Sequence, residues 1–327
     1  MNSLLIREAM QTVLRGGRLE EKEALKLINL PLDEAPDLVA AAHRVRLAYK
    51  GKTVRLCAIV NAKSGRCGED CAFCAQSSHY RTAAAVYPLL PAEEILSRAR
   101  QAASDGACGF GIVTSGVRIR RGDEWQELLR AVRLISLDGR PEPHASLGLL
   151  TPEQAQELRA AGATTYHHNL ETAPSFFPSI CTTHPISEDF ATIRAAKGAG
   201  LAVCCGGILG LGETPAQRVE LALTLRELEV DSVPLNFLNP IPGTPLENRP
   251  LLPAWEAIKA VAVFRLLLPD KDIRLCGGKE RTLRQLLPLA LLAGANGLMT
   301  GNYLTTSGRQ PELDRELVAD LGFELDS

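Results

Sequence analysis

The chain has 327 residues, of which nine are cysteines. Hydrophobic residues make up 46% and charged residues 23%, which is ordinary for a globular protein and excludes wholesale disorder. With 36 Lys and Arg against 38 Asp and Glu the net charge is −2. The chain therefore lacks the excess of positive charge that is typical of proteins that bind nucleic acid or an anionic membrane. The N-terminus lacks the apolar run of a signal peptide, and no stretch approaches the ~18 apolar residues of a membrane span. We therefore expect a cytoplasmic protein, whose cysteines are thiols or metal ligands rather than disulfides.

The chain alternates short apolar runs with longer amphipathic stretches. Apolar residues at three- and four-residue spacing predict helices over 3–15, 20–27 and 32–50. Eight apolar runs then predict strands at 54–61, 109–113, 144–147, 164–168, 201–207, 232–237, 273–276 and 297–300. Helical patterns lie between and after them, at 91–104, 123–135, 152–160, 187–199, 215–228, 254–268, 281–293 and 312–321.

Eight strand–helix alternations imply parallel strands, and eight is the strand count of a (β/α)8 barrel. We predict an α/β fold, a TIM-type barrel with an N-terminal helical cap. The division would be a cap at 1–50, a barrel at 51–308, and a C-terminal helix and tail at 309–327. A doubly wound open sheet is the alternative, but no G-x-G-x-x-G follows the first strand. Chemistry in such a barrel gathers where the strands end.

Three cysteines follow the first predicted strand at C-x3-C-x2-C spacing: Cys67, Cys71 and Cys74. Their thiolates can hold one inorganic cluster, and a four-iron cube bound by three ligands keeps one iron open. Structural zinc sites are usually four-coordinate, so a zinc site fits this spacing less well. Unliganded thiols are the remaining alternative.

The same segment, with Phe73 before the third cysteine, is similar to the signature of radical S-adenosylmethionine (SAM) enzymes, and NAKSGRCGEDCAFCAQSSHY resembles the biotin synthase family. Segments 166–172, 206–214, 233–246 and 294–306 also match later motifs of that family. The resemblance implies a (β/α)8 barrel with a 4Fe–4S cluster on the three cysteines. The open iron would chelate SAM, and its reductive cleavage would give a 5′-deoxyadenosyl radical. The reaction would convert dethiobiotin to biotin with a flavodoxin- or ferredoxin-type electron donor, commonly in a homodimer.

Four further residues match positions that serve SAM and substrate in that family. Ile208, in the glycine-rich segment after the fifth strand, would lie on the adenine face. Asn169 would contact substrate and cofactor, and Glu171, where the family commonly has Asp, would lie near the SAM ribose. Asn236, an unusual polar residue in an apolar strand, would meet the ureido group of the substrate. The plain alternatives are a strand-to-helix turn capped by Thr214, and polar strand ends satisfied by backbone.

The resemblance also implies a second cluster deeper in the barrel, from which the inserted sulfur comes. Its well-known form is a 2Fe–2S cluster held by three cysteines and an arginine. Those four positions fall on Gly111, His144, Cys204 and Arg274. Two of the cysteines are therefore absent, and a standard 2Fe–2S site cannot be carried over.

A different set of cysteines is available as ligands for a second cluster: Cys57, Cys181, Cys204 and Cys276. Because strand side chains alternate, Cys276 shares a face with Arg274, the family's arginine position. Four thiolates from strands or strand ends suit a four-iron cluster better than a two-iron one. We therefore expect an auxiliary four-iron cluster on these four cysteines.

Three other residues are interpreted as packing. Free cysteine often fills core space, which is the simpler reading of Cys108 and Cys205 and the alternative for the four-cysteine set. His144, at a position where the family has cysteine, is interpreted as a satisfied core histidine, with ligation as the alternative. The alternative function is another radical SAM reaction on a small molecule, such as amino-acid isomer or metallocofactor assembly. An iron–sulfur carrier or sensor is disfavoured, because the predicted substrate pocket would have no use in one.

Overall fold

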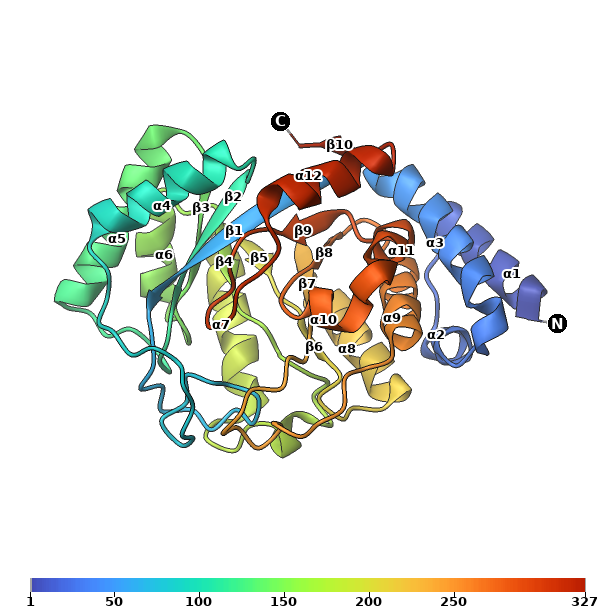
Figure 1. Ribbon diagram of the computed structural model, residues 1–327, viewed down its shortest axis with the longest axis horizontal. Coiled ribbons are helices and arrows are strands. Elements are labelled where there is room, and N and C mark those ends of the chain that lie inside the picture. Colours follow the sequence, from blue (N-terminus) through green and yellow to red (C-terminus); the bar gives the residue numbers. More distant parts are fainter. Residues whose placement is uncertain (1, 327) are drawn as a thin grey trace.

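The computed structural model describes residues 2–326 and shows a closed barrel of parallel strands surrounded by helices (Figure 1). Neighbouring strands around the barrel are joined by parallel pairings, and β9 pairs with β1 to close it. The barrel confirms the (β/α)8 prediction and excludes the open sheet. In order around it lie β1 (Thr53–Lys63), β2 (Gly109–Thr114), β3 (Glu142–Ser146), β4 (Thr165–His167), β5 (Ala202–Cys204), β7 (Ser232–Phe237), β8 (Asp272–Leu275) and β9 (Gly297–Met299).

Helices on the outer side cover the strands, whose apolar residues form one continuous core. Thr151 and Thr214 begin two of these helices as N-caps, each in a capping box and each followed by proline. The layer consists of α4 (Ala92–Ser104), α5 (Asp123–Asp138), α6 (Pro152–Ala160), η2 (Phe177–Ser179), α7 (Ile186–Gly198), α8 (Pro215–Glu227), α9 (Ala254–Leu267), α10 (Lys279–Leu283), η3 (Arg284–Leu286) and α11 (Leu287–Leu292).

The N-terminal helices lie beside α9 and α11 on one flank of the barrel (Figure 1). They are α1 (Asn2–Leu14), α2 (Glu21–Ile28), η1 (Leu32–Glu34) and α3 (Ala35–Lys50). The buried Arg46 of α3 ties them to the barrel, donating to the carbonyls of Gly51 at 2.8 Å and Ala295 at 3.1 Å. No helix within residues 2–326 is long and apolar enough to cross a membrane.

The last segment forms α12 (Pro311–Asp320) and the short strand β10 (Glu324–Leu325). The sequence pattern did not predict β10. It pairs in parallel with the start of β1, Thr53 with Glu324, so the end of the chain is attached to the outside of the barrel.

Two predicted elements are interrupted. The run 201–207 divides into β5 and β6 (Gly207–Leu209), because Pro234 of the neighbouring strand β7 has no N–H to donate to it. At the break, a Cβ on Gly206 would lie 2.0 Å from the Pro234 carbonyl oxygen. The predicted helix 281–293 breaks into α10, η3 and α11 at Arg284, whose φ is +50°.

Candidate functional site

A cavity of about 440 Å³ opens at the C-terminal ends of the barrel strands, within the size range of small-molecule sites. Its lining includes all three cysteines of the C-x3-C-x2-C motif and the residues predicted to contact cofactor and substrate. These are Cys67, Cys71, Phe73, Cys74, Asn169, Glu171, Ile208 and Asn236. Residues from distant parts of the sequence are therefore brought to one cavity.

The cysteine loop (residues 64–78) is folded by its own backbone. Cys67 donates its N–H to the Gln76 carbonyl at 3.0 Å and accepts from the Ser78 N–H at 2.8 Å. A tight turn joins Cys71 to Cys74 through an N–H···O bond of 2.9 Å. The loop thus presents three thiols to one cavity, and this donor set fits a four-iron cluster with one open iron.

The cysteine thiols of this loop are held in their neutral form in the protein alone. Burial raises the pKa of Cys74 to about 11 and also raises that of Cys67. The pKa of Cys71 is raised by a hydrogen bond with Cys181 and by burial. Because metal binds thiolates, loading of this loop must release protons.

Asn169 and Glu171 follow β4 and are fixed by the break between β5 and β6. The Asn169 Oδ1 accepts from the Gly206 N–H at 3.1 Å, and its amide lies 3.5 Å from a Glu171 carboxylate oxygen. The Glu171 backbone has a positive φ of 62° and accepts from the Ile208 N–H at 2.7 Å. Burial raises the pKa of the Glu171 carboxyl to about 8, so this group is largely protonated at neutral pH.

Glycine is required in the segment after β5 because neighbouring backbone leaves no room for a side chain there. A Cβ on Gly207 would lie 2.6 Å from the Glu171 carbonyl oxygen. Glu213 closes the turn beyond, accepting from the Gly210 and Gly212 N–H groups at 2.8 and 3.0 Å. The segment thereby presents Ile208 to the cavity, where it packs with Phe73 against a small apolar cluster of Ile180, Leu211 and Leu238.

Asn236 has the partners that a polar residue in an apolar strand requires. Its Oδ1 accepts from the Gly277 N–H at 3.0 Å, and its amide nitrogen donates to the Gly207 carbonyl at 3.4 Å. Backbone on both sides therefore fixes the side chain where it lines the cavity.

Three of the four cysteines expected at the second cluster gather around Arg274. These three, the deep thiol group, are Cys57, Cys204 and Cys276, and all are buried. Burial raises the pKa of each thiol, to about 11 for Cys204. Burial alone would lower the pKa of Arg274, but interaction with Cys57, Cys204, Asp272 and Cys276, in that order, raises it overall.

The surroundings of Arg274 fit a metal cluster. Its Nε is buried and has no hydrogen-bond partner among residues 2–326, although buried polar groups normally have one. A negatively charged cluster on the deep thiol group would meet this unpaired donor.

The two positions where cysteines are absent are filled differently. A Cβ on Gly111 would lie 3.0 Å from Cγ2 of Ile59, whose side chain takes the adjoining space. His144 is buried over Gly109, and its Nδ1 lies 3.2 Å from Nε2 of His167. Burial lowers the pKa of both imidazoles, so both are neutral.

Cys181 does not join the deep thiol group, and the expected four-cysteine set needs this correction. Its loop lies over the cysteine loop, where the thiol hydrogen-bonds Cys71 and lies 3.4 Å from Nδ1 of His184. Strand alternation could not place it, because Cys181 follows η2 in a segment without strand register. Cys205, in contrast, packs in the apolar core as expected.

Sequence reasoning gave no role to a group of titratable side chains at the cavity wall: Glu69, His168, His184 and Asp189. His168 contacts Asp189 at 2.8 Å, and His184 contacts Glu69 at 2.8 Å. Only the position of His168 at a strand end could have signalled this group.

Comparison with known proteins agrees with the geometry. Residues 62–225 match the model of the radical SAM superfamily, and residues 234–324 match that of the biotin and thiamin synthesis associated domain. The biotin synthase of Geobacter sulfurreducens is 57% identical over 310 residues, covering 95% of this chain and 94% of that protein. That of Citrifermentans bemidjiense is 51% identical, covering 98% of this chain and 97% of that protein.

Solved structures share the fold at low identity. Methylornithine synthase superposes with a TM-score of 0.84 at 21% identity, covering 98% of this chain and 97% of that one. The FeFe-hydrogenase maturase of Carboxydothermus hydrogenoformans gives 0.80 at 18% identity, covering 98% and 79%. With the cysteine loop, the cavity and matches along nearly its whole length, this chain belongs to the biotin synthase family of the radical SAM superfamily.

Proposed function

We propose that this protein converts dethiobiotin to biotin by inserting sulfur, with SAM as the radical source. The observation that carries the proposal is the convergence of the cysteine loop, Asn169, Glu171, Ile208 and Asn236 on one cavity. When bound, the 4Fe–4S cluster and SAM supply a 5′-deoxyadenosyl radical that abstracts hydrogen from unactivated carbon.

The chain's own residues would bind and orient the cofactors and the substrate, and they would exclude water from the cavity. Cys67, Cys71 and Cys74 would hold the cluster. Phe73 and Ile208 give the cavity an apolar wall, which protects a reactive species from solvent. Because burial raises the pKa of Glu171 to about 8, its carboxyl is able to donate a hydrogen bond at neutral pH, which a SAM ribose hydroxyl can accept.

Asn169 and Asn236 would act by position. Each has its side-chain oxygen committed to a backbone N–H, from Gly206 and Gly277 respectively. Their orientation is therefore set before any ligand enters, and each amide N–H₂ retains a donor for cofactor or for the substrate ureido oxygen.

We also propose that the deep thiol group, with Arg274, holds the auxiliary cluster that supplies the sulfur, in an atypical form without two of the family's usual cysteines. Three thiolates with one open iron suit a four-iron cluster, as in the cysteine loop. The buried, unpartnered Nε of Arg274 supports a negatively charged occupant.

An anaerobic reconstitution tests both proposals. The full chain is loaded with iron and sulfide and given SAM, reductant and dethiobiotin. Biotin formation with about eight irons per chain is expected. Deoxyadenosine without biotin would point to the second candidate, another small-molecule radical reaction, which the glycine at 111 and histidine at 144 favour. Cys57→Ala, Cys204→Ala and Cys276→Ala should each lower the iron count, whereas Cys108→Ala should not.

We propose, further, a flavodoxin- or ferredoxin-type electron donor, a homodimer, and the division into a cap at 1–50, a barrel at 51–308 and a tail at 309–327. The pairing of β10 with β1 supports a tail that is docked on the barrel. Sedimentation of the holoenzyme tests the dimer, and removal of residues 309–327 should lower the melting temperature.

A further inference from the structure

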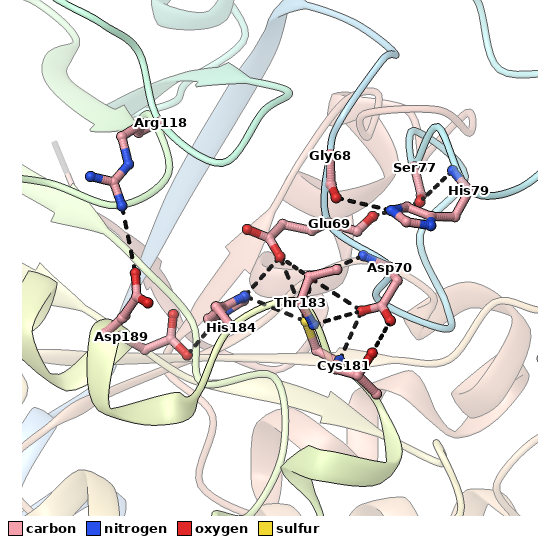
Figure 2. A network of polar contacts seen from close by, with 12 residues as sticks. Gly68, Glu69, Asp70, Ser77, His79, Arg118, Cys181, Thr183, His184 and Asp189 are labelled. Atoms are coloured by element: carbon pink, nitrogen blue, oxygen red, sulfur yellow. Dashed lines mark hydrogen bonds and ion pairs between the residues drawn. The ribbon is translucent and has the colours of Figure 1, made fainter.

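Three side chains of different chemistry converge where the loop after η2 meets the cysteine loop (Figure 2). The Glu69 carboxylate comes from the cysteine loop, and Cys181 and His184 come from the other. The Nδ1 of His184 lies 2.8 Å from the Glu69 Oε2 and 3.4 Å from the Cys181 Sγ. The Cys181 Sγ lies 3.8 Å from the Glu69 Oε2.

Two hydrogen bonds hold these loops together. The Asp70 Oδ1 accepts from the Thr182 N–H at 2.8 Å, and the Ala72 N–H donates to the Ile180 carbonyl at 2.9 Å. These bonds hold both segments in place beside the three side chains. Glu69 and His184 line the cavity, which gives an ion a route of entry, whereas Cys181 is only 2% exposed.

The histidine is oriented as metal-binding histidines are. While Nδ1 of His184 faces the cysteine and the glutamate, its Nε2 lies 3.3 Å from the Asp189 Oδ2. His168 contacts the other oxygen of Asp189 at 2.8 Å. A carboxylate beside the far ring nitrogen keeps a proton there, so that the near nitrogen can ligate once it has lost its own proton. This contact is independent of the three donor distances.

We propose that Glu69, Cys181 and His184 bind a zinc or ferrous ion. One thiolate, one imidazole and one carboxylate are the donors these ions take, and harder ions such as Mg²⁺ and Ca²⁺ avoid sulfur. Tetrahedral ligation requires donor separations of about 3.4–3.6 Å. The two separations that involve sulfur are close to this, and the nitrogen–oxygen pair widens once the ion replaces the proton between them. The Cys181 thiol proton and this Nδ1 proton leave to solvent.

The simpler interpretation is a hydrogen-bonded pair, Glu69 with His184, that merely pins the loops together. The two interpretations differ at Cys181. A hydrogen-bonded pair that only holds the loops together does not need the thiol. An ion does need it, because the Cys181 sulfur is one of only three protein donors. Three donors leave a fourth position for solvent, as in open zinc sites.

The test uses the full chain with Cys67→Ala, Cys71→Ala and Cys74→Ala, so that no cluster forms on the cysteine loop. Anaerobic titration with Co²⁺, a spectroscopic substitute for zinc, should give thiolate-to-cobalt absorption. Adding Cys181→Ala should remove one equivalent of this absorption, and the matched variant Cys108→Ala should leave it unchanged. Competition by Zn²⁺ and by Fe²⁺ then shows which ion binds more tightly.

Two more variants keep the test decisive if Cys181→Ala folds poorly by circular dichroism. His184→Gln should remove the same absorption, and Asp189→Asn should weaken cobalt binding about 10–100-fold without abolishing it. Cobalt absorption that is unchanged in Cys181→Ala or in His184→Gln would overturn the proposal. Because the assay measures neither SAM cleavage nor biotin, its result stands apart from that of the proposed function.

Discussion

The turn that presents Ile208 to the cavity depends on one buried carboxylate, Glu213. Its side chain is 3% exposed and accepts from Gly210, Gly212 and the Arg218 Nε, the last at 2.8 Å. Glu213→Gln keeps the size but places an N–H₂ group against donors and removes the charge opposite Arg218. Breaking a buried ion pair from one side costs about 3–5 kcal/mol. At about 1.5 °C per kcal/mol for a chain of this length, the melting temperature should fall by about 4–7 °C.

Differential scanning fluorimetry of the anaerobic protein measures this shift. Glu229→Gln is the matched control, because Glu229 is 79% exposed and its pair with Lys197 spans 3.4 Å. An exposed pair of this kind contributes about 0–1 kcal/mol, so the control should shift the transition by no more than about 1.5 °C. Equal shifts in the two variants would refute the reasoning that Glu213 organises the turn.

Three further predictions follow from close contacts. Gly206→Ala should prevent folding to a soluble protein, because its Cβ would lie 2.0 Å from the Pro234 carbonyl oxygen; a normal yield would contradict this. Lys279→Met should lower thermal stability by about 1–3 kcal/mol and raise the KM for dethiobiotin, because the buried ammonium donates to the hydroxyl of Tyr303, a cavity residue, at 2.6 Å. In the metal-free protein, hydrogen bonding with Asp189 raises the pKa of His184 to about 10, so the stability it contributes is present below pH 6.5 and lost towards pH 10. The difference in melting temperature between wild type and His184→Gln should shrink over that range, and a constant difference would contradict it.

The barrel and the cysteine loop were predictable because their signals are local. Strand runs and capped helices repeat along the chain, and Cys67, Cys71 and Cys74 lie within one short loop. The residues at the cavity, such as Asn169 and Asn236, were found through family motifs at strand ends, and the closed barrel brings those ends together.

What could not be predicted depends on contacts between distant segments. Strand alternation placed Cys276 beside Arg274, but it had no bearing on Cys181, which lies in a loop held by Asp70. The break between β5 and β6 arises from Pro234 on the neighbouring strand, which the fifth strand's own sequence does not reveal.

The origin of the inserted sulfur tests the central claim most directly. The protein is reconstituted with sulfide enriched in a heavy isotope, freed of excess sulfide, and allowed one turnover with dethiobiotin and SAM. Mass spectrometry should find heavy biotin from the wild type. Cys204→Ala, which removes a member of the deep thiol group, should give deoxyadenosine but no biotin. Light biotin from the wild type, or undiminished heavy biotin from Cys204→Ala, would contradict a sulfur source held by the deep thiol group.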